Sequence, residues 1–159
     1  MPTRSAWIVL AVLVVALALA VPIGGPEPRT GLSPTATVAV IDEDGETLGT
    51  VAVAVADTPG ERYTGLSDTA ALEPDEGMLF IFPEEARRTF VMRDMAVPID
   101  MIFVGANRTI TAIYHAPVEG DRPLTEYTGE AKWVVEVPYG WTTRHDVTVG
   151  DRVRIADPR

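Results

Sequence analysis

Two short apolar segments, Gly77–Phe82 and Ile99–Val104, constrain the fold of this chain more than any other feature. Apolar side chains occupy nearly every position in both, so neither segment has the polar face of an amphipathic helix. Each is also too short to form a helix of that kind. Apolar residues at both alternating positions are typical of strands covered on both faces of a sheet. The sequence therefore predicts two central strands that are buried on two sides.

A β-hairpin is predicted before these strands. β-rich runs at 37–41 and 50–56 lie on either side of Asp44-Gly45, two turn residues that tolerate positive φ. Other β-rich segments follow later in the chain. They are residues 108–116, 132–137 and 149–155. Because these strands follow one another with few crossover helices, the sequence predicts a closed or half-closed barrel.

Two short helices are predicted between the strands. Thr58 is a suitable N-cap, Pro59 fits the first turn, and Glu61 places an acid near the positive end of the helix dipole. Gly65 would end this helix, and residues 140–145 would form a second helical turn. The predicted fold class is α+β: a compact, β-rich single domain with a barrel-like sheet and two short helices.

The amino-terminal segment predicts a membrane location. Residues 6–21 are all apolar and follow Arg4; as a helix they would span roughly 24 Å, slightly less than a bilayer core. Residues 1–23 are predicted to be a signal anchor or a signal peptide, 24–36 a Pro- and Gly-rich linker, and 37–156 the folded domain. An uncleaved anchor would hold the domain at the cell membrane, outside the cytoplasm. Cleavage would make the domain a secreted protein.

The charge of the chain argues against nucleic acid as a partner. The formal net charge is −10, and Lys132 is the one lysine. Acidic residues are spread along the soluble part, whereas a phosphate backbone is bound by clustered cations. We interpret the acidity as a determinant of solubility, and adaptation to high salt is a hypothesis that follows from it. The expected partners are the membrane, through the amino-terminal helix, and a small polar ligand or cell-envelope component.

Motifs for catalysis and cofactor binding are not found in the sequence. There is no cysteine and no phosphate-binding glycine loop. Ser67 lacks the second glycine of a nucleophile elbow, and His115 and His145 lack the spacing of a metal-binding pair. The sequence therefore predicts no catalytic residue, no metal site and no cofactor.

Asp100 is the polar residue that most needs an explanation, because it begins the second apolar segment. An unpaired charge buried there would cost several kcal/mol, so the carboxylate needs partners. Arg62, Arg88 and Arg93 are the candidate partners. Two interpretations stay open: an ion pair or backbone hydrogen bonds that fix the start of the strand, or the polar floor of a pocket. In the second, the candidate ligand-binding residues are Arg62, Met92, Arg93, Asp94 and Asp100.

Several short motifs resemble those of a known family. They are R-x-x-G-L at 62–66, G-M-L-F at 77–80, P-I-D at 98–100, Val135-Glu136 to Gly140, and Gly150-Asp151. Their order and spacing resemble the DUF192 family, also called UPF0127, over about residues 37–156. The resemblance implies a compact β-rich domain behind a signal or an anchor, with no established substrate, cofactor or catalytic residue. The chain departs from the family pattern at Ser67, Val91 and residues 93–95, where the family has Met, Trp and Lys-Asn-Thr.

Three functions are compatible with these features. The first is an extracytoplasmic, membrane-tethered binding or accessory module for a small polar or cell-envelope ligand. The second is a carboxylate-dependent hydrolase that acts on an envelope polymer, which requires another acid about 5 to 9.5 Å from Asp100 across an open cleft. The third is a structural protein-interaction module, which would expose an apolar patch of several hundred Å². The absence of catalytic motifs favours the first.

Overall fold

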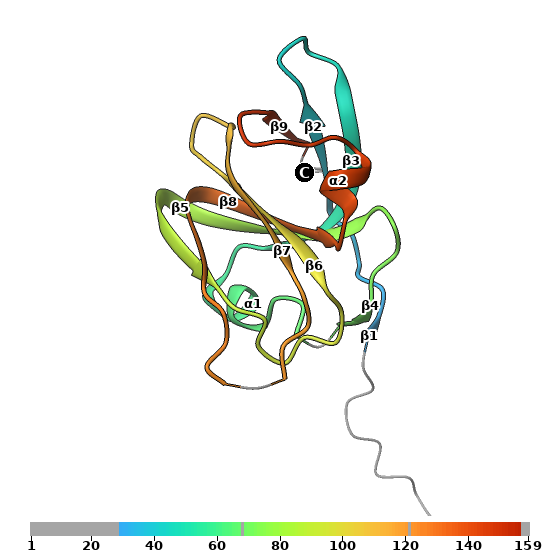
Figure 1. Ribbon diagram of the computed structural model, residues 1–159, viewed down its shortest axis with the longest axis vertical. Helices are drawn as coiled ribbons and strands as arrows, with labels where there is room; N and C mark the ends of the chain where they lie inside the picture. Colours follow the sequence, from blue (N-terminus) through green and yellow to red (C-terminus); the bar gives the residue numbers. More distant parts are fainter. Residues whose placement is uncertain (1–28, 68, 121, 157–159) are drawn as a thin grey trace, which may run out of the picture.

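The computed structural model describes residues 29–67, 69–120 and 122–156. The predicted anchor or signal peptide lies outside these residues. The described part consists of strands with two short helices between them (Figure 1). The strands are β1 (Arg29–Thr30), β2 (Ala36–Ile41), β3 (Thr47–Ala56), β4 (Thr69–Ala71), β5 (Glu76–Phe90), β6 (Ile99–Val104), β7 (Ile110–Ala116), β8 (Tyr127–Pro138) and β9 (Arg152–Ala156). The helices are α1 (Pro59–Thr64) and α2 (Trp141–Arg144).

The main sheet is curled into a half-barrel (Figure 1). Within the described residues its strand order is β7-β6-β8-β5-β3-β2-β9, and β1 pairs separately with β4. The two edge strands meet at one end, where Thr109 and Arg152 form a β-bridge and Ile110 N–H donates to the carbonyl of Asp151 at 2.8 Å. The prediction of a compact, β-rich domain with a half-closed sheet and two short helices is confirmed.

The predicted hairpin is formed by β2 and β3. In its turn, the Asp42 carboxylate accepts hydrogen bonds from the backbone N–H groups of Asp44 and Glu46, at 3.0 and 2.8 Å. Gly45 has a φ of 87°, which a glycine adopts without steric cost. β3 begins at Thr47, three residues before the predicted start, because pairing with β2 continues up to the turn.

The first helix, α1, has the predicted cap. Thr58 Oγ1 accepts the backbone N–H of Glu61, and the Glu61 carboxylate accepts the backbone N–H of Thr58 at 2.9 Å. These bonds favour the ionised form, so the pKa of the Glu61 carboxyl is lowered. Gly65 ends the helix with a φ of 51°. The helix is only six residues long, and this reciprocal cap fixes its start.

The strand β5 is longer than its apolar run predicts. It continues through the charged segment after Phe82 and pairs with β8 again after a register shift between Ile81 and Ala86. Glu84 and Glu85 are exposed there. Polar residues are accommodated because this part of the strand faces solvent, so hydrophobic periodicity does not reveal it.

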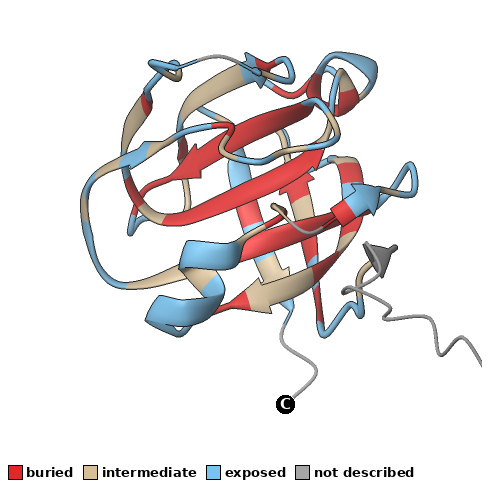
Figure 2. Cartoon of the chain, turned by 90° about the horizontal axis from the view of Figure 1, so that it is seen from below, coloured by how far each residue is buried: buried red, intermediate tan, exposed pale blue. Residues whose placement is uncertain are grey.

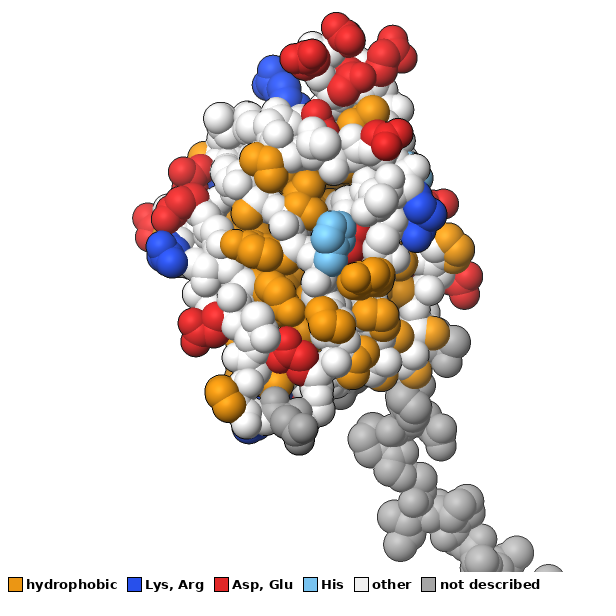
Figure 3. All heavy atoms as spheres, viewed as in Figure 1, with side chains coloured by type: hydrophobic (Ala, Val, Ile, Leu, Met, Phe, Trp, Pro, Cys, Tyr) orange, Lys and Arg blue, Asp and Glu red, His pale blue; other side chains and the backbone are white. Residues whose placement is uncertain are grey.

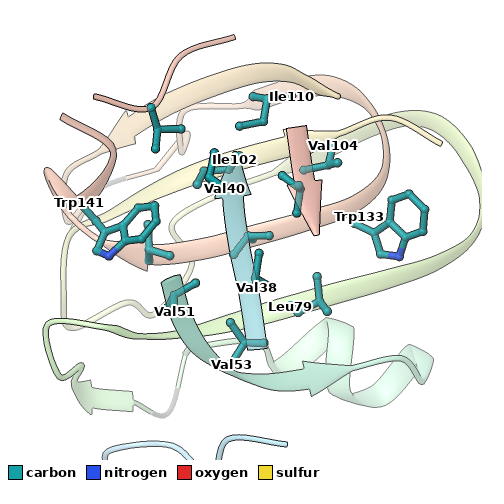
Figure 4. Close-up of a cluster of buried hydrophobic side chains, with 14 of the residues drawn as sticks. Val38, Val40, Val51, Val53, Leu79, Ile102, Val104, Ile110, Trp133 and Trp141 are labelled. Atoms are coloured by element: carbon teal, nitrogen blue, oxygen red, sulfur yellow. The ribbon is translucent and has the colours of Figure 1, made fainter. Parts of the chain in front are cut away.

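The sheet separates two apolar cores, because side chains alternate between its faces. All six residues of β6 are buried, as predicted for a central strand. Ile102 and Val104 point into the core inside the curl, together with Val38 and Trp141 (Figure 4). Met101 and Phe103 belong to the second core, on the opposite face. Figure 2 shows burial concentrated in the strands, whereas α1 has no buried residue.

Gly77 is required where β5 lies closest to β8. A Cβ added at this position would collide with the backbone oxygen of Glu136 and approach Val51 and Val137 at 3.3 Å. We expect Gly77→Ala to lower the free energy of unfolding by about 2 kcal/mol, because the two central strands must separate. Urea denaturation measures this change. Gly60→Ala in α1 is the matched control: nothing lies within 4 Å of its added Cβ, so it should be neutral or raise stability by about 0.5 kcal/mol. Equal effects of the two substitutions would contradict the close approach of β5 to β8 at Gly77.

Candidate functional site

A pocket of about 300 Å³ lies between α1, β5 and the segment that follows β5. This volume is at the lower end of the range for small-molecule sites. About half of its lining residues are aromatic or aliphatic, among them Leu66, Phe80, Phe82, Phe90 and Met95, and three hydroxyl side chains also line it: Thr64, Ser67 and Thr89. Three charged side chains also line it: Arg62, Arg93 and Glu136. The pocket therefore combines aromatic and aliphatic walls with several polar side chains, which could orient a ligand.

Arg62 connects α1 to β5 beside the pocket. Its guanidinium donates hydrogen bonds to the carbonyl of Asp57 and, at 2.9 Å, to the carbonyl of Ile81. It also lies over the ring of Phe82, 5.2 Å from the centroid. Both hydrogen bonds use Nη1, and a guanidinium carries five N–H donors. The anchored side chain therefore keeps donors for another group.

Arg93 approaches the pocket from the segment after β5. Its guanidinium stacks on Tyr63 at 4.1 Å and donates to the Tyr63 carbonyl. Asp94 is a weak ionic partner: the closest charged atoms are 3.8 Å apart, and the Asp94 side chain is 77% exposed. Exposed pairs of this kind contribute little, because water screens them. The positive charge of Arg93 is therefore largely uncompensated by Asp94 and lies at the mouth of the pocket.

Glu136 is the buried charged residue of the pocket. It lies in the middle of β8, paired with Met78 of β5 on one side and Met101 of β6 on the other. The residue is 5% exposed. Burial raises the pKa of its carboxyl to about 8. Among the side-chain hydrogen bonds and ion pairs of the described residues, none involves this carboxyl. No fully enclosed side-chain oxygen there lacks a partner, so the carboxyl oxygens keep some accessible surface at the pocket. A mostly neutral carboxylic acid therefore faces the pocket at neutral pH.

Glu76 is a second buried glutamate, and its surroundings differ from those of Glu136. It is also buried, at 7% exposure. Its carboxylate, however, accepts backbone N–H groups from Leu32 and, at 3.1 Å, from Glu73. Glu76 is thus a structural acid that fixes two backbone segments, whereas the Glu136 carboxyl has no such partner among the described residues and lines a pocket.

Asp100 forms a closed polar cluster of its own. Its side chain is fully buried, and the backbone N–H groups of Gly140 and Thr142 donate to it at 3.0 and 2.9 Å. The Thr142 hydroxyl donates at 2.6 Å, and Nδ1 of His115 lies 2.7 Å from Oδ1. Asp100 therefore joins β6, β7 and the start of α2.

Comparison with known proteins identifies the family. The model of the DUF192 family, described as "Uncharacterized ACR", matches residues 39–155. The chain belongs to the DUF192 family. No curated protein matches the chain.

Two solved structures are similar to this DUF192 domain. One is a "putative transcription regulator" from Sinorhizobium meliloti 1021, with 29% sequence identity and a TM-score of 0.69; the match covers 77% of this chain and 95% of that chain. The other is a protein of unknown function from Novosphingobium aromaticivorans DSM 12444, with 30% identity and a TM-score of 0.66, covering 74% and 83% of the two chains. Both structures share the fold of this DUF192 domain.

The residues proposed from sequence as one site occupy different places in the DUF192 domain. Arg62 and Arg93 both line the pocket. Met92 is fully buried in the second core and does not line the pocket, and Asp94 points to solvent. Asp100 lies on the opposite face of the sheet from Met101 and is not among the residues that line the pocket. None of the three arginines proposed as its partners contacts it in the described part; His115, Gly140 and Thr142 do.

Glu136 was missed as a site residue, although the sequence contains a signal for it. It lies within Val134-Val135-Glu136-Val137, and a glutamate inside such an apolar run needs the same explanation as Asp100. The register of β8 between β5 and β6 is what places it on the pocket face, and that register follows from long-range pairing.

Two further properties concern the described part of this DUF192 chain. Neither of its helices has the length and apolar character needed to cross a membrane. No cluster of three or more histidine, aspartate or glutamate side chains in it is arranged to hold a metal ion.

Proposed function

We propose that this DUF192 domain is a binding module for a small organic anion with an apolar body, and that residues 1–23 hold it outside the cytoplasm at the membrane. The observation that carries the binding proposal is the pocket at α1 and β5: the buried Glu136, which has no hydrogen-bond or ion-pair partner among the described residues, faces a partly aromatic space whose mouth has two arginines. The location rests on the apolar run at 6–21 after Arg4. Protection of the domain from added protease in intact spheroplasts would contradict that location.

The chemistry of the pocket favours an anion. The chain has a net charge of −10, yet Arg62 and Arg93 place two cations at one opening. A guanidinium binds carboxylate and phosphate groups through paired hydrogen bonds. The aromatic side chains Phe80, Phe82 and Phe90 leave an interior that suits a ring or a short aliphatic chain. A small anion with such a body would use both features.

The hydrolase alternative has less support in this geometry. Asp100 is fully buried and already accepts hydrogen bonds from its neighbours, so it does not face an open cleft. Hydrolysis of a glycan by the usual mechanism needs two carboxyl groups on either side of the scissile bond. Among the described residues that line the pocket, Glu136 is the one carboxylate.

A protein-interaction module has one observation in its favour. In Figure 3, apolar side chains gather over the middle of one face, and acidic side chains lie around its margin. The strongly exposed large apolar residues are nevertheless far apart in the sequence. They are Tyr63, Val91, Val118, Tyr139 and Val149. A partner protein would be the remaining candidate if no small molecule bound.

A thermal-shift screen of the purified full chain against small carboxylates and phosphate esters tests the binding proposal. We expect a saturable stabilisation, because a ligand at 100 times its Kd stabilises the native state by about 2.7 kcal/mol. The double substitution Arg62→Gln and Arg93→Gln should abolish it. Arg87→Gln is the matched control, since Arg87 is an exposed arginine of β5 outside the pocket. Stabilisation that survives the double substitution, or its complete absence across the screen, would contradict the proposal.

A further inference from the structure

The pocket has two chemically different ends. Arg62 and Arg93 are both partly exposed and lie at the mouth. Glu136 is 5% exposed and lies at the floor, between Met78 and Met101. Neither arginine forms an ion pair with Glu136, so the described residues leave the floor and the mouth as separate binding points. A ligand that spans the pocket must satisfy both.

The side chains next to Glu136 within the sheet do not favour its ionised form. From β5 and β6 the neighbours are Met78 and Met101, which carry no charge. Asp100, the acid of β6, lies on the other face of the sheet. The charged groups of α1 and of the segment after β5 are Glu61, Arg62, Arg93 and Asp94. Glu61 is used in the helix cap, and Asp94 points to solvent. Neither arginine forms an ion pair with Glu136, and burial is the cause that raises the pKa of its carboxyl.

We infer that the ligand binds with its anionic group at Arg62 and Arg93 and with a neutral oxygen acceptor, such as a carbonyl or an ether, at Glu136. This inference rests on the proposed binding function and specifies its ligand class. The protonated carboxyl of Glu136 donates one hydrogen bond to the acceptor. A cationic group is disfavoured at the floor, because Glu136 would have to ionise between two methionines and the cation would have to lose its water.

Ligand selection should then depend on pH. Burial raises the pKa of Glu136 to about 8, so the donor is present at pH 6.5 and largely lost at pH 9.5. Below this pKa the acid donates to an acceptor oxygen. Above it, the carboxylate repels the lone pairs of the same oxygen. The preference for an acceptor should therefore fall as the pH rises.

Four aromatic probes separate the contributions of the two ends. Benzoate has the anion and the ring, 4-acetylbenzoate adds a neutral acceptor, 4-(aminomethyl)benzoate adds a cation, and acetophenone has the acceptor without the anion. Isothermal titration calorimetry with the full chain gives Kd at pH 6.5 and pH 9.5. At pH 6.5 we expect 4-acetylbenzoate to bind roughly five-fold more tightly than benzoate, as one hydrogen bond allows. At pH 9.5 this ratio should fall to about one.

Substitutions at Glu136 assign the effect to this residue. Glu136→Met, which matches its neighbours in shape and polarity, should remove the preference at both pH values. Glu136→Gln keeps an N–H donor and should retain the preference without its pH dependence. Arg62→Gln should weaken benzoate and 4-acetylbenzoate equally and leave their ratio unchanged.

The outcomes distinguish this inference from the binding proposal. Two results would overturn the neutral-acceptor inference. One is that 4-(aminomethyl)benzoate binds most tightly at pH 6.5, and the other is that benzoate and 4-acetylbenzoate bind with equal affinity. In both cases the binding proposal itself would still stand. Weak binding of all four probes, together with a different saturable ligand that needs Arg62 and Arg93, would overturn only the inferred class. Failure of every compound in the wider screen would overturn the binding proposal as well.

Discussion

Replacing Asp100 with alanine is expected to lower the free energy of unfolding by about 3 to 5 kcal/mol. Removing one member of a buried, hydrogen-bonded charged cluster leaves the others without partners. Here the change would strand two backbone N–H groups and the Thr142 hydroxyl, and would leave His115 without its buried acceptor. These groups hold the start of α2 against β6 and β7, so the effect should be a global loss of stability.

Urea denaturation of the full chain measures this effect, and two substitutions provide its controls. Asp100→Asn keeps one acceptor oxygen and should cost less, about 2 kcal/mol. Asp94→Ala removes an exposed acid and should change stability by no more than about 0.5 kcal/mol. If Asp100→Ala were as mild as Asp94→Ala, the hydrogen-bonded cluster around Asp100 would not be a stabilising feature.

The stability of the wild-type protein should fall by about 3 kcal/mol between pH 5 and pH 8 because of Glu136 alone. Burial raises the pKa of this carboxyl from 4.5 to about 8. Between these values the folded protein holds a proton that the unfolded chain has released. Stability therefore decreases as the pH rises through this interval and levels off above pH 8.

The contribution of Glu136 is isolated by comparing pH profiles of chemical denaturation. Glu136→Gln cannot titrate, so its unfolding free energy should lack this fall, and the gap between the two proteins should widen in favour of the variant from pH 5 to pH 8. Glu76→Gln is a control at another buried glutamate, one whose carboxylate has backbone donors. Glu76→Gln should lower the free energy of unfolding but leave the decrease between pH 5 and pH 8 that Glu136 causes. Parallel profiles for wild type and Glu136→Gln would show that Glu136 is not held neutral.

Local features of the fold could be predicted from the sequence because their causes are local. The Asp44-Gly45 turn, the capping box at Thr58 and Glu61, and the two-sided burial of β6 each depend on residues close together in the chain. The strand order could not be predicted in this way. β8 lies between β5 and β6 through pairings that join distant segments, and the solvent-facing half of β5 has no apolar periodicity.

The candidate site could be predicted from the sequence only in part, because some of its contacts join distant segments of the chain. Arg62 and Arg93 were proposed from the sequence as partners of Asp100 and as pocket residues; they line one pocket together, but they do not contact Asp100. The alternation along β6 already places Asp100 with Ile102 and Val104, away from Met101. What the sequence does not show is which face of that strand the arginines approach. This depends on how α1 and the segment after β5 pack over the sheet.

The position of β8 also determines when this domain can fold during its synthesis. β8 lies between β5 and β6 in the sheet but follows both in the chain. Before residue 138 has been made, β2, β3 and β5 on one side and β6 and β7 on the other lack the strand that joins them by hydrogen bonds. Pairings between such distant segments form late and slowly. The nascent chain therefore lacks its complete core until most of it has left the ribosome. Up to that point it could still pass through a narrow channel as an unfolded chain.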